Sequence, residues 1–203
     1  MKKILIYALL AATLCLCLSS CANEEALPQL PYLLIKREDH YIIEANLSSL
    51  DQEAYRLDIP EEVDGLPVVY VQNRGFFNAT KLVILHVPGS VKQIDEAAFF
   101  GCTSLQKVTV DRGMQSLGSS TFASCPALRE VTLPNTLTYM GWCVFDECPS
   151  LTEITFEGTT AEWEAVEKTE AFWTDSDEED IPWYFGSAIK VVHCTDGDIA
   201  VGE

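Results

Sequence analysis

The sequence predicts an α/β-type repeat solenoid, a short right-handed superhelix that is strand-rich, contains a parallel β-sheet and carries a cap at each end. Three observations predict it. First, a 23-residue period relates AFFGCTSLQKVTV, TFASCPALREVTL and VFDECPSLTEITF. Second, apolar and polar residues alternate within each copy, which is typical of a strand with one buried face. Third, the period dissolves at both ends of the array, where a solenoid needs caps.

The repeat itself rests on apolar positions that recur in 23-residue steps between residues 57 and 156. A period in the twenties with an L-x-x-L-x-L core is the signature of a leucine-rich repeat. One copy cannot bury its apolar side alone, but stacked copies form a parallel sheet, with strands ~4.8 Å apart, over one continuous core. The leucine register is Leu82, Leu105, Leu128 and Leu151, and the register that closes each coil is Phe76, Phe99, Phe122 and Phe145.

Within each predicted strand, the alternation separates an inward set from an outward set. Val108 is expected to face the core, and Lys107 and Thr109 are expected to face solvent. Stacking of the copies then places Val131 and Ile154 beside Val108 on neighbouring rungs, all facing inward.

Prolines and glycines mark the ends of these strands. Pro88 and Pro134 stand just past the predicted strands, where a missing N–H costs little. Gly118 and Gly141 follow buried positions and are expected to allow a tight turn. We expect each coil to close through the phenylalanine register, on the far side of the core from the strand.

One copy, LREVTLPNTLTYMGWCVFDEC at residues 128–148, resembles the unit of BspA-type bacterial surface leucine-rich repeats, approximately L-x-x-L-x-L-P-x-x-V-x-x-I-G-x-x-A-F-x-x-C. The resemblance covers about residues 39–197, since IPEEVDGLPVVYV and EGTTAEWEAV are similar to the family's flanking segments. It implies non-catalytic recognition at the bacterial surface. Three positions depart from the unit: Ala79 replaces Cys, Asp95 replaces Gly and Asp111 replaces Pro.

The N-terminus resembles a bacterial lipoprotein signal peptide. Lys2 and Lys3 precede a largely apolar run over residues 4–18, which is short for a membrane span and suits a signal sequence. The run ends in LSSC, whose likeness to a lipobox implies cleavage before Cys21 and lipidation of that cysteine. The alternative is cleavage after Ala22, which releases a soluble secreted protein. Lipidation implies a protein of the bacterial cell envelope, anchored in the membrane by Cys21 and exposed on the extracytoplasmic side.

We expect five segments along the chain. TTAEWEAVEKTEAFW predicts a short helix with a capping box formed by Thr159 and Glu162, and AIKVVHC predicts a strand. Aromatic residues gather in the C-terminal cap, either as its core or as a platform for a sugar or peptide. In order, the segments are a lipoprotein signal peptide at 1–20, a tether at 21–33, an N-terminal cap at 34–56, leucine-rich repeats at 57–158 and a C-terminal cap at 159–203.

Charge and motif content argue against several functions. The net charge of −18 repels phosphate backbones, so we expect no nucleic-acid partner. His40, His86 and His193 are scattered singly and the sequence contains no known catalytic or phosphate-binding motif, so we expect no catalytic residue, metal or other cofactor. The acidic run at 175–180 lacks the glycine and terminal glutamate of an EF-hand loop and is expected to be a solvated loop.

Three cysteines share one register of the repeat. Cys102, Cys125 and Cys148 lie 23 residues apart, unlike the close pairs typical of zinc ligands. Rungs ~4.8 Å apart place their Cβ atoms farther from each other than the about 3.8 Å of a disulfide. We therefore expect buried, unreactive thiols that fill the core. Whether Cys143 and Cys194 form a disulfide stays open.

The outward strand positions are the candidate binding site. In leucine-rich repeats this face is the usual docking surface. Threonine is also a good strand residue with favourable cross-strand pairing, so its recurrence has a purely structural explanation as well. The candidate residues are Lys107, Thr109, Glu130, Thr132, Glu153 and Thr155, in two rows that begin with Ile84 and His86.

The predicted function is that of a surface-anchored, non-catalytic binding or adhesion module for an unknown protein or glycan partner at the cell surface. One alternative is a structural envelope lipoprotein that contacts other envelope components. Another is an enzyme with an unrecognised site, for which the sequence offers no constellation of residues. About four coils make a small surface, so strong adhesion would depend on many copies displayed together.

Overall fold

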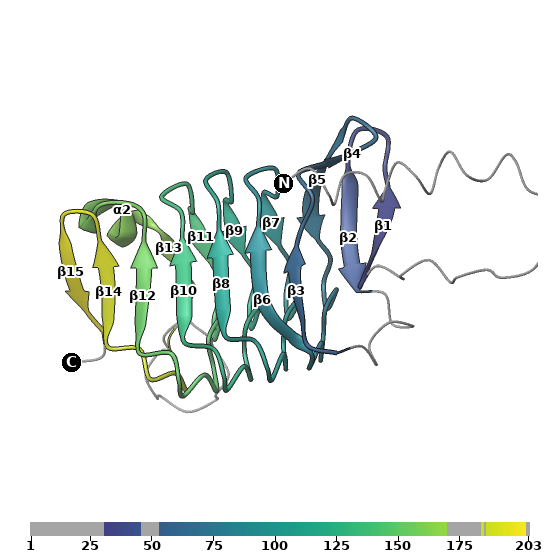
Figure 1. Ribbon diagram of the computed structural model, residues 1–203. Helices are drawn as coiled ribbons and strands as arrows, with labels where there is room; N and C mark the ends of the chain where they lie inside the picture. The colour runs from purple at the N-terminus through teal and green to yellow at the C-terminus, as the bar shows by residue number, and fades with distance from the viewer. Residues whose placement is uncertain (1–30, 46–52, 170–183, 185, 202–203) are drawn as a thin grey trace, which may run out of the picture.

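The structure is a computed structural model that describes residues 31–45, 53–169, 184 and 186–201. In the side view of Figure 1, coils stack one beside another from β1 (Tyr32–Lys36) at the N-terminal end to β15 (Gly197–Ala200) at the C-terminal end. Two sheets run along this stack, and both consist mainly of parallel strands. The predicted repeat solenoid is therefore confirmed.

One sheet lies in front in Figure 1 and contains the predicted repeat strands. We call it the large sheet because each of its strands has at least four residues, although the other sheet has one strand more. Its strands are parallel except for β15, which pairs antiparallel with its neighbour. Val131 lies opposite Val108, and Thr132 lies opposite Thr155, so equivalent residues of successive copies are in register. The order is β15, β14 (Val191–Cys194), β12 (Glu153–Phe156), β10 (Glu130–Leu133), β8 (Lys107–Val110), β6 (Leu82–Val87) and β3 (Tyr55–Asp58).

A second sheet runs behind the first, which the expectation of a single sheet missed. Five of its strands have only two residues, too few to show an alternating pattern in a sequence. Only β1 and the short β4 (Glu62–Val63) pair antiparallel with their neighbours. The order is β1, β2 (Tyr41–Ala45), β5 (Leu66–Val71), β7 (Gln93–Ile94), β9 (Ser116–Leu117), β11 (Tyr139–Met140) and β13 (Glu167–Lys168).

The third side of each coil is a turn in which two residues have left-handed backbone conformations, one on either side of the buried phenylalanine. Backbone N–H groups of this turn donate to carbonyls of the next coil, as Phe76 N does to Ala98 O at 2.7 Å and Phe99 N to Thr121 O at 2.9 Å. The ladder of turns satisfies backbone groups that lie outside both sheets. The left-handed residues are Arg74, Asn78, Ala97, Gly101, Ser120, Ser124, Cys143 and Glu147.

The core is one continuous column of stacked side chains. Val108, Val131 and Ile154 lie side by side on neighbouring strands and are at most 3% exposed, as predicted. On the opposite side, four fully buried phenylalanines stack with ring centroids 5.1, 5.5 and 5.9 Å apart. This near-parallel stacking adds to the hydrophobic contribution of each ring.

Prolines and glycines of the repeat have different roles. Pro88 and Pro134 directly follow β6 and β10, as predicted. Gly118 and Gly141 directly precede the turn on the third side of their coils, as predicted, but neither has a positive φ. They are needed for close approach instead, since a Cβ on Gly118 would lie 2.5 Å from the backbone nitrogen of Glu96 on the preceding coil.

The caps close the two ends of the column. At the N-terminal end, the antiparallel pair β1 and β2 joins the second sheet, and β1 begins at Tyr32, two residues before the range expected for the cap. At the C-terminal end, α2 (Thr160–Ala165) begins with the predicted capping box of Thr159 and Glu162. Trp163 of this helix is 3% exposed and packs against Phe156, with ring centroids 5.2 Å apart.

None of the helices in the described part of the chain is long and apolar enough to span a membrane.

Candidate functional site

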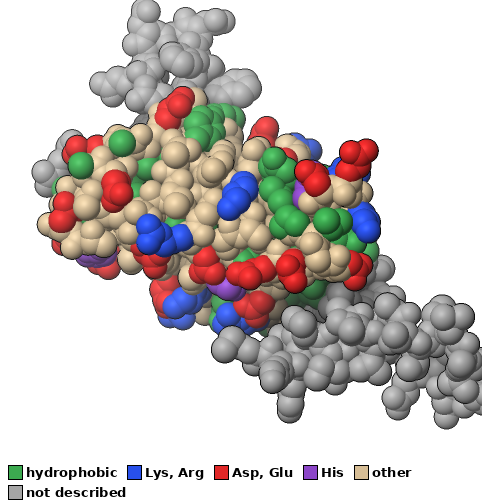
Figure 2. All heavy atoms as spheres, turned by 90° about the horizontal axis from the view of Figure 1, so that it is seen from above, with side chains coloured by type: hydrophobic (Ala, Val, Ile, Leu, Met, Phe, Trp, Pro, Cys, Tyr) green, Lys and Arg blue, Asp and Glu red, His purple; other side chains and the backbone are tan. Residues whose placement is uncertain are grey.

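The six candidate residues lie together on the outward face of the large sheet. Strand pairing arranges them in two rows that cross β8, β10 and β12. The charged row contains Lys107, Glu130 and Glu153, and the hydroxyl row contains Thr109, Thr132 and Thr155. In Figure 2, which looks down on the molecule of Figure 1, charged and histidine side chains gather along the edge that this sheet forms.

Charges in the charged row pair with one another across the strands. Lys107 Nζ lies 2.9 Å from Glu130 Oε2, and Arg129 Nη2 lies 4.0 Å from Glu130 Oε1. The hydrogen bond from Lys107 lowers the pKa of Glu130 below its usual value. Both side chains of the Lys107–Glu130 pair are about half exposed, so solvent screens the interaction and it fixes orientation more than stability.

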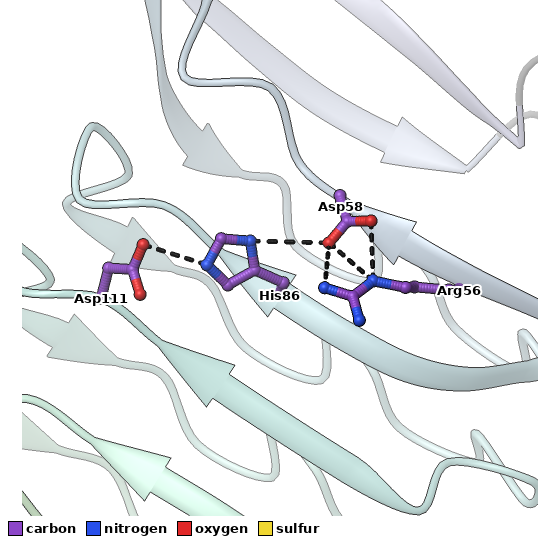
Figure 3. Close-up of polar contacts among 4 residues, drawn as sticks. All are labelled: Arg56, Asp58, His86 and Asp111. Carbon is purple, nitrogen blue, oxygen red and sulfur yellow. Dashed lines mark hydrogen bonds and ion pairs between the residues drawn. The ribbon is translucent and has the colours of Figure 1, made fainter. Parts of the chain in front are cut away.

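At the N-terminal end of the hydroxyl row, His86 lies between two carboxylates (Figure 3). Its Nε2 is 3.0 Å from Asp111 Oδ2, and its Nδ1 is 3.6 Å from Asp58 Oδ1. Arg56 Nε in turn donates to both carboxylate oxygens of Asp58, at 2.8 and 2.7 Å, and lowers the pKa of that carboxyl. Asp111 occupies the repeat position where a proline is expected, and its carboxylate makes this contact, which a proline could not.

At the C-terminal end of the same row, His193 of β14 also lies between two carboxylates. Its Nδ1 is 2.9 Å from Asp198 Oδ1, and its Nε2 is 3.3 Å from Glu153 Oε2. The hydrogen bonds that the ring makes to Asp198 and then to Glu153 raise the pKa of His193 above its usual value. The imidazole therefore connects the last repeat strand, β12, to the terminal hairpin of β14 and β15.

The hydroxyl row differs from its surroundings. Thr109 and Thr132 are partly exposed and Thr155 is exposed. Within the described part of the chain, none of these three side-chain hydroxyls makes a hydrogen bond to the protein, whereas Thr121, Thr136 and other threonines do. The row is thus a line of unbonded donor and acceptor groups between paired charges.

The sequence interpretation found this face but not its full extent. His86 was placed at the start of the hydroxyl row, and the structure confirms its register, with Thr109 opposite it. His193 was missed, although it lies opposite Thr155. The distance in sequence from Thr155 to His193 breaks the 23-residue period, because α2 and β13 intervene, so the period could not indicate this neighbour.

The recurring thiols belong to the core, as predicted. Cys102, Cys125 and Cys148 are fully buried, and each Sγ lies 3.1–3.4 Å from the carbonyl oxygen of a phenylalanine on the preceding coil. The hydrogen bond with Cys125, together with burial, raises the pKa of Cys148, which makes the reactive thiolate scarce. Cys143 and Cys194 are both free thiols, so this structure contains no disulfide between them.

Some expected features fall outside the described residues. These include the signal peptide and Cys21, the acidic run at 175–180 and part of the aromatic cluster of the C-terminal cap. Among the residues that the structure does describe, no group of three or more His, Cys, Asp or Glu side chains could hold a metal ion.

The fold and the outward strand rows define a leucine-rich repeat solenoid. The family model described as "BspA type Leucine rich repeat region" matches residues 57–172 with six copies. The chain belongs to this family.

One solved structure agrees with this assignment at the level of the fold, and two others are reported with it. A leucine-rich repeat protein from Bacteroides capillosus ATCC 29799 is similar, with a TM-score of 0.52 and 28% identity over 64% of this chain and 97% of that one. The T. pallidum leucine-rich repeat protein TpLRR gives a TM-score of 0.43 and 28% identity over 61% of this chain and 67% of that one. A leucine-rich cell surface protein from Faecalibacterium prausnitzii A2-165 gives 0.45 and 23%, over 68% of this chain and 43% of that one. A search of curated proteins found no match.

Proposed function

We propose that this chain is a non-catalytic binding module of the bacterial cell surface, which docks a protein or glycan partner on the outward face of the large sheet. The observation that carries the proposal is the pair of in-register rows on β8, β10 and β12. Strands held in register over a buried column keep these side chains at fixed spacing, so little ordering is needed when a partner binds.

The proposal includes a lipid anchor at Cys21. Its support is the order of features at the N-terminus: Lys2 and Lys3, an apolar run at 4–18 and then LSSC. Two or more acyl chains hold a protein on a membrane where one does not. Metabolic labelling with a fatty-acid analogue is expected to mark the wild type and not Cys21→Ser, and an unlabelled wild type would remove the anchor from the proposal.

The docking face is tested by replacing Lys107, Thr109, Glu130 and Thr132 with alanine in the full chain. We expect the quadruple variant to lose capture of ligand from host and bacterial surface extracts. The matched control is Gln93→Ala with Ser116→Ala on the second sheet, which should capture as the wild type does. Equal capture by the quadruple variant and the wild type, with both still folded by circular dichroism, would show that the partner docks elsewhere.

A further inference from the structure

The groups left without a partner on the outward face point to one class of ligand. Resting on the function proposed above, we infer that the partner of this face is an uncharged glycan that lies across the strands and hydrogen-bonds to the hydroxyl row, Thr109, Thr132 and Thr155. Three features carry the inference: the pairing of the charges, the chemistry of the free groups and the spacing of the row.

The charged groups of the face are already paired with each other. Lys107 is bonded to Glu130 at 2.9 Å, Arg56 to Asp58 at 2.7 Å and His193 to Asp198 at 2.9 Å. A charged partner would have to compete with these pairs for the same side chains. The rest of the chain carries a large negative charge, which repels acidic polymers at longer range. An uncharged partner meets neither cost.

The free groups of the face are hydroxyls. Each threonine hydroxyl can donate one hydrogen bond and accept two, and the hydroxyls of Thr109, Thr132 and Thr155 make none to the described protein. Sugar hydroxyls have the same dual capacity, so each contact can form in either direction. A partner with this chemistry replaces water at the row without leaving a buried donor or acceptor unsatisfied.

The spacing of the row favours a chain that crosses the strands. Neighbouring strands fix the three hydroxyls ~4.8 Å apart along a line perpendicular to the strands. An extended peptide presents one face every second residue, about 6.6–6.8 Å, and falls out of step with that line. One sugar unit of an extended β-linked glycan is close to the strand spacing in length. Successive units are turned by about half a turn, but each carries hydrogen-bonding groups on both ring edges, so successive units can still meet successive threonines.

The experiment measures retention of the full chain on insoluble polysaccharides. The neutral, extended β-linked probes are cellulose, chitin and β-mannan; starch is the coiled α-linked comparison, and pectate is the acidic one. We expect retention on at least one β-linked probe, at least about tenfold above starch and pectate. Retention should persist from about 0.05 to about 0.5 M salt, because an uncharged ligand is not screened.

Three variants assign the binding to the row. Thr109→Val, Thr132→Val and Thr155→Val together keep the β-branched shape and remove the hydroxyls, and should weaken retention at least about tenfold. Serine at the same three positions should restore it. Thr103→Val, which removes an exposed hydroxyl in a turn away from the sheet, should bind as the wild type does. The thermal unfolding midpoint of each variant shows that it is folded.

The outcomes separate this inference from the proposed function. The glycan inference is overturned by the absence of binding to all three β-linked probes, by equal binding to pectate, or by undiminished binding of the triple valine variant. If the chain instead captures a protein and the quadruple alanine variant loses it, the proposed function stands without the glycan. If neither ligand class binds the face, both fail.

Discussion

The two faces of the large sheet are made by the same strands but are organised by different interactions. On the inward face, Val108, Val131 and Ile154 are at most 3% exposed and pack against their equivalents on the next rung. On the outward face, charges pair across strands, and the hydroxyls of Thr109 and Thr132 bond to nothing in the described protein. The inward repetition is thus explained by packing, whereas the outward hydroxyls make no bond that holds the fold together.

The largest contrast is expected between a core phenylalanine and an outward threonine. Phe122 is fully buried in the middle of the phenylalanine stack, between Phe99 and Phe145. Phe122→Ala should lower the free energy of unfolding by about 3–5 kcal/mol, because it removes a ring and leaves a cavity. Thr132→Val should change it by no more than about 0.5 kcal/mol. Urea unfolding measures the free energy of unfolding of both variants. Similar losses in the two would contradict the view that the core stabilises the fold and the outward hydroxyls do not.

A smaller effect is expected on the turn side of the coil. Ser120 has φ of 52°, in the left-handed region, where its backbone N–H donates to Trp142 O on the next coil. Ser120→Val should destabilise the chain by about 1–3 kcal/mol, because a β-branched side chain crowds the backbone in this conformation. Ser120→Gly is the matched control, since glycine adopts a positive φ without steric cost. If the Ser120→Val and Ser120→Gly variants unfold at the same urea concentration, the backbone at Ser120 does not disfavour a β-branched side chain.

The sequence predicted the parts of the fold in which one residue type repeats for a packing reason. Leucine, valine and phenylalanine registers indicated the rungs, and the capping box of Thr159 and Glu162 indicated the start of α2. The second sheet was not predicted because most of its strands are two residues long, and the left-handed turns were not predicted because their positions hold different residues. Only Gly101 among the eight left-handed positions is a glycine, so composition gives no sign of the conformation.

The candidate site, like the fold, was predicted only where its residues follow the 23-residue period. Thr109 and Thr132 follow from the period, but the charge pairs of His86 and His193 do not. Asp111 pairs with His86 because it replaces the proline of the repeat, and Asp198 reaches His193 from a hairpin outside the repeat. Both contacts depend on departures from the period, which become interpretable only once the register of the strands is known.

Within the core, the thiol register should tolerate change better than the phenylalanine register. Cys125→Ala removes one buried sulfur and should cost about 1 kcal/mol, since the void is close to a methyl group in size. Cys194→Ala is the control, because Cys194 is only partly buried and should cost less. In the folded wild type, a thiol reagent should modify Cys194 first and leave Cys102, Cys125 and Cys148 unmodified until unfolding. Rapid modification of Cys125 in the native state would contradict its place in the core.

The smallest expected effect is the pH dependence at the C-terminal end of the hydroxyl row. Asp198 and Glu153 raise the pKa of His193 above its ordinary value of 6.5, so the protonated imidazole stabilises the folded state. This contribution is fully present below pH 6.5 and is lost as the pH rises through the raised pKa. Because the three side chains are exposed, the effect should be a small fall in the unfolding midpoint between mildly acidic and mildly alkaline solution.

His193→Gln isolates this contribution. Glutamine keeps a polar side chain on β14 but cannot carry the charge that attracts Asp198 and Glu153, so the variant should lose the part of the pH dependence that the wild type owes to His193. An NMR titration of the wild type should give a pKa for this ring above that of histidine in the unfolded chain. A pKa at or below the unfolded value would mean that the two carboxylates do not hold the ring in solution. The hairpin of β14 and β15 would then be joined to β12 through the backbone pairing of β14, without this side-chain link.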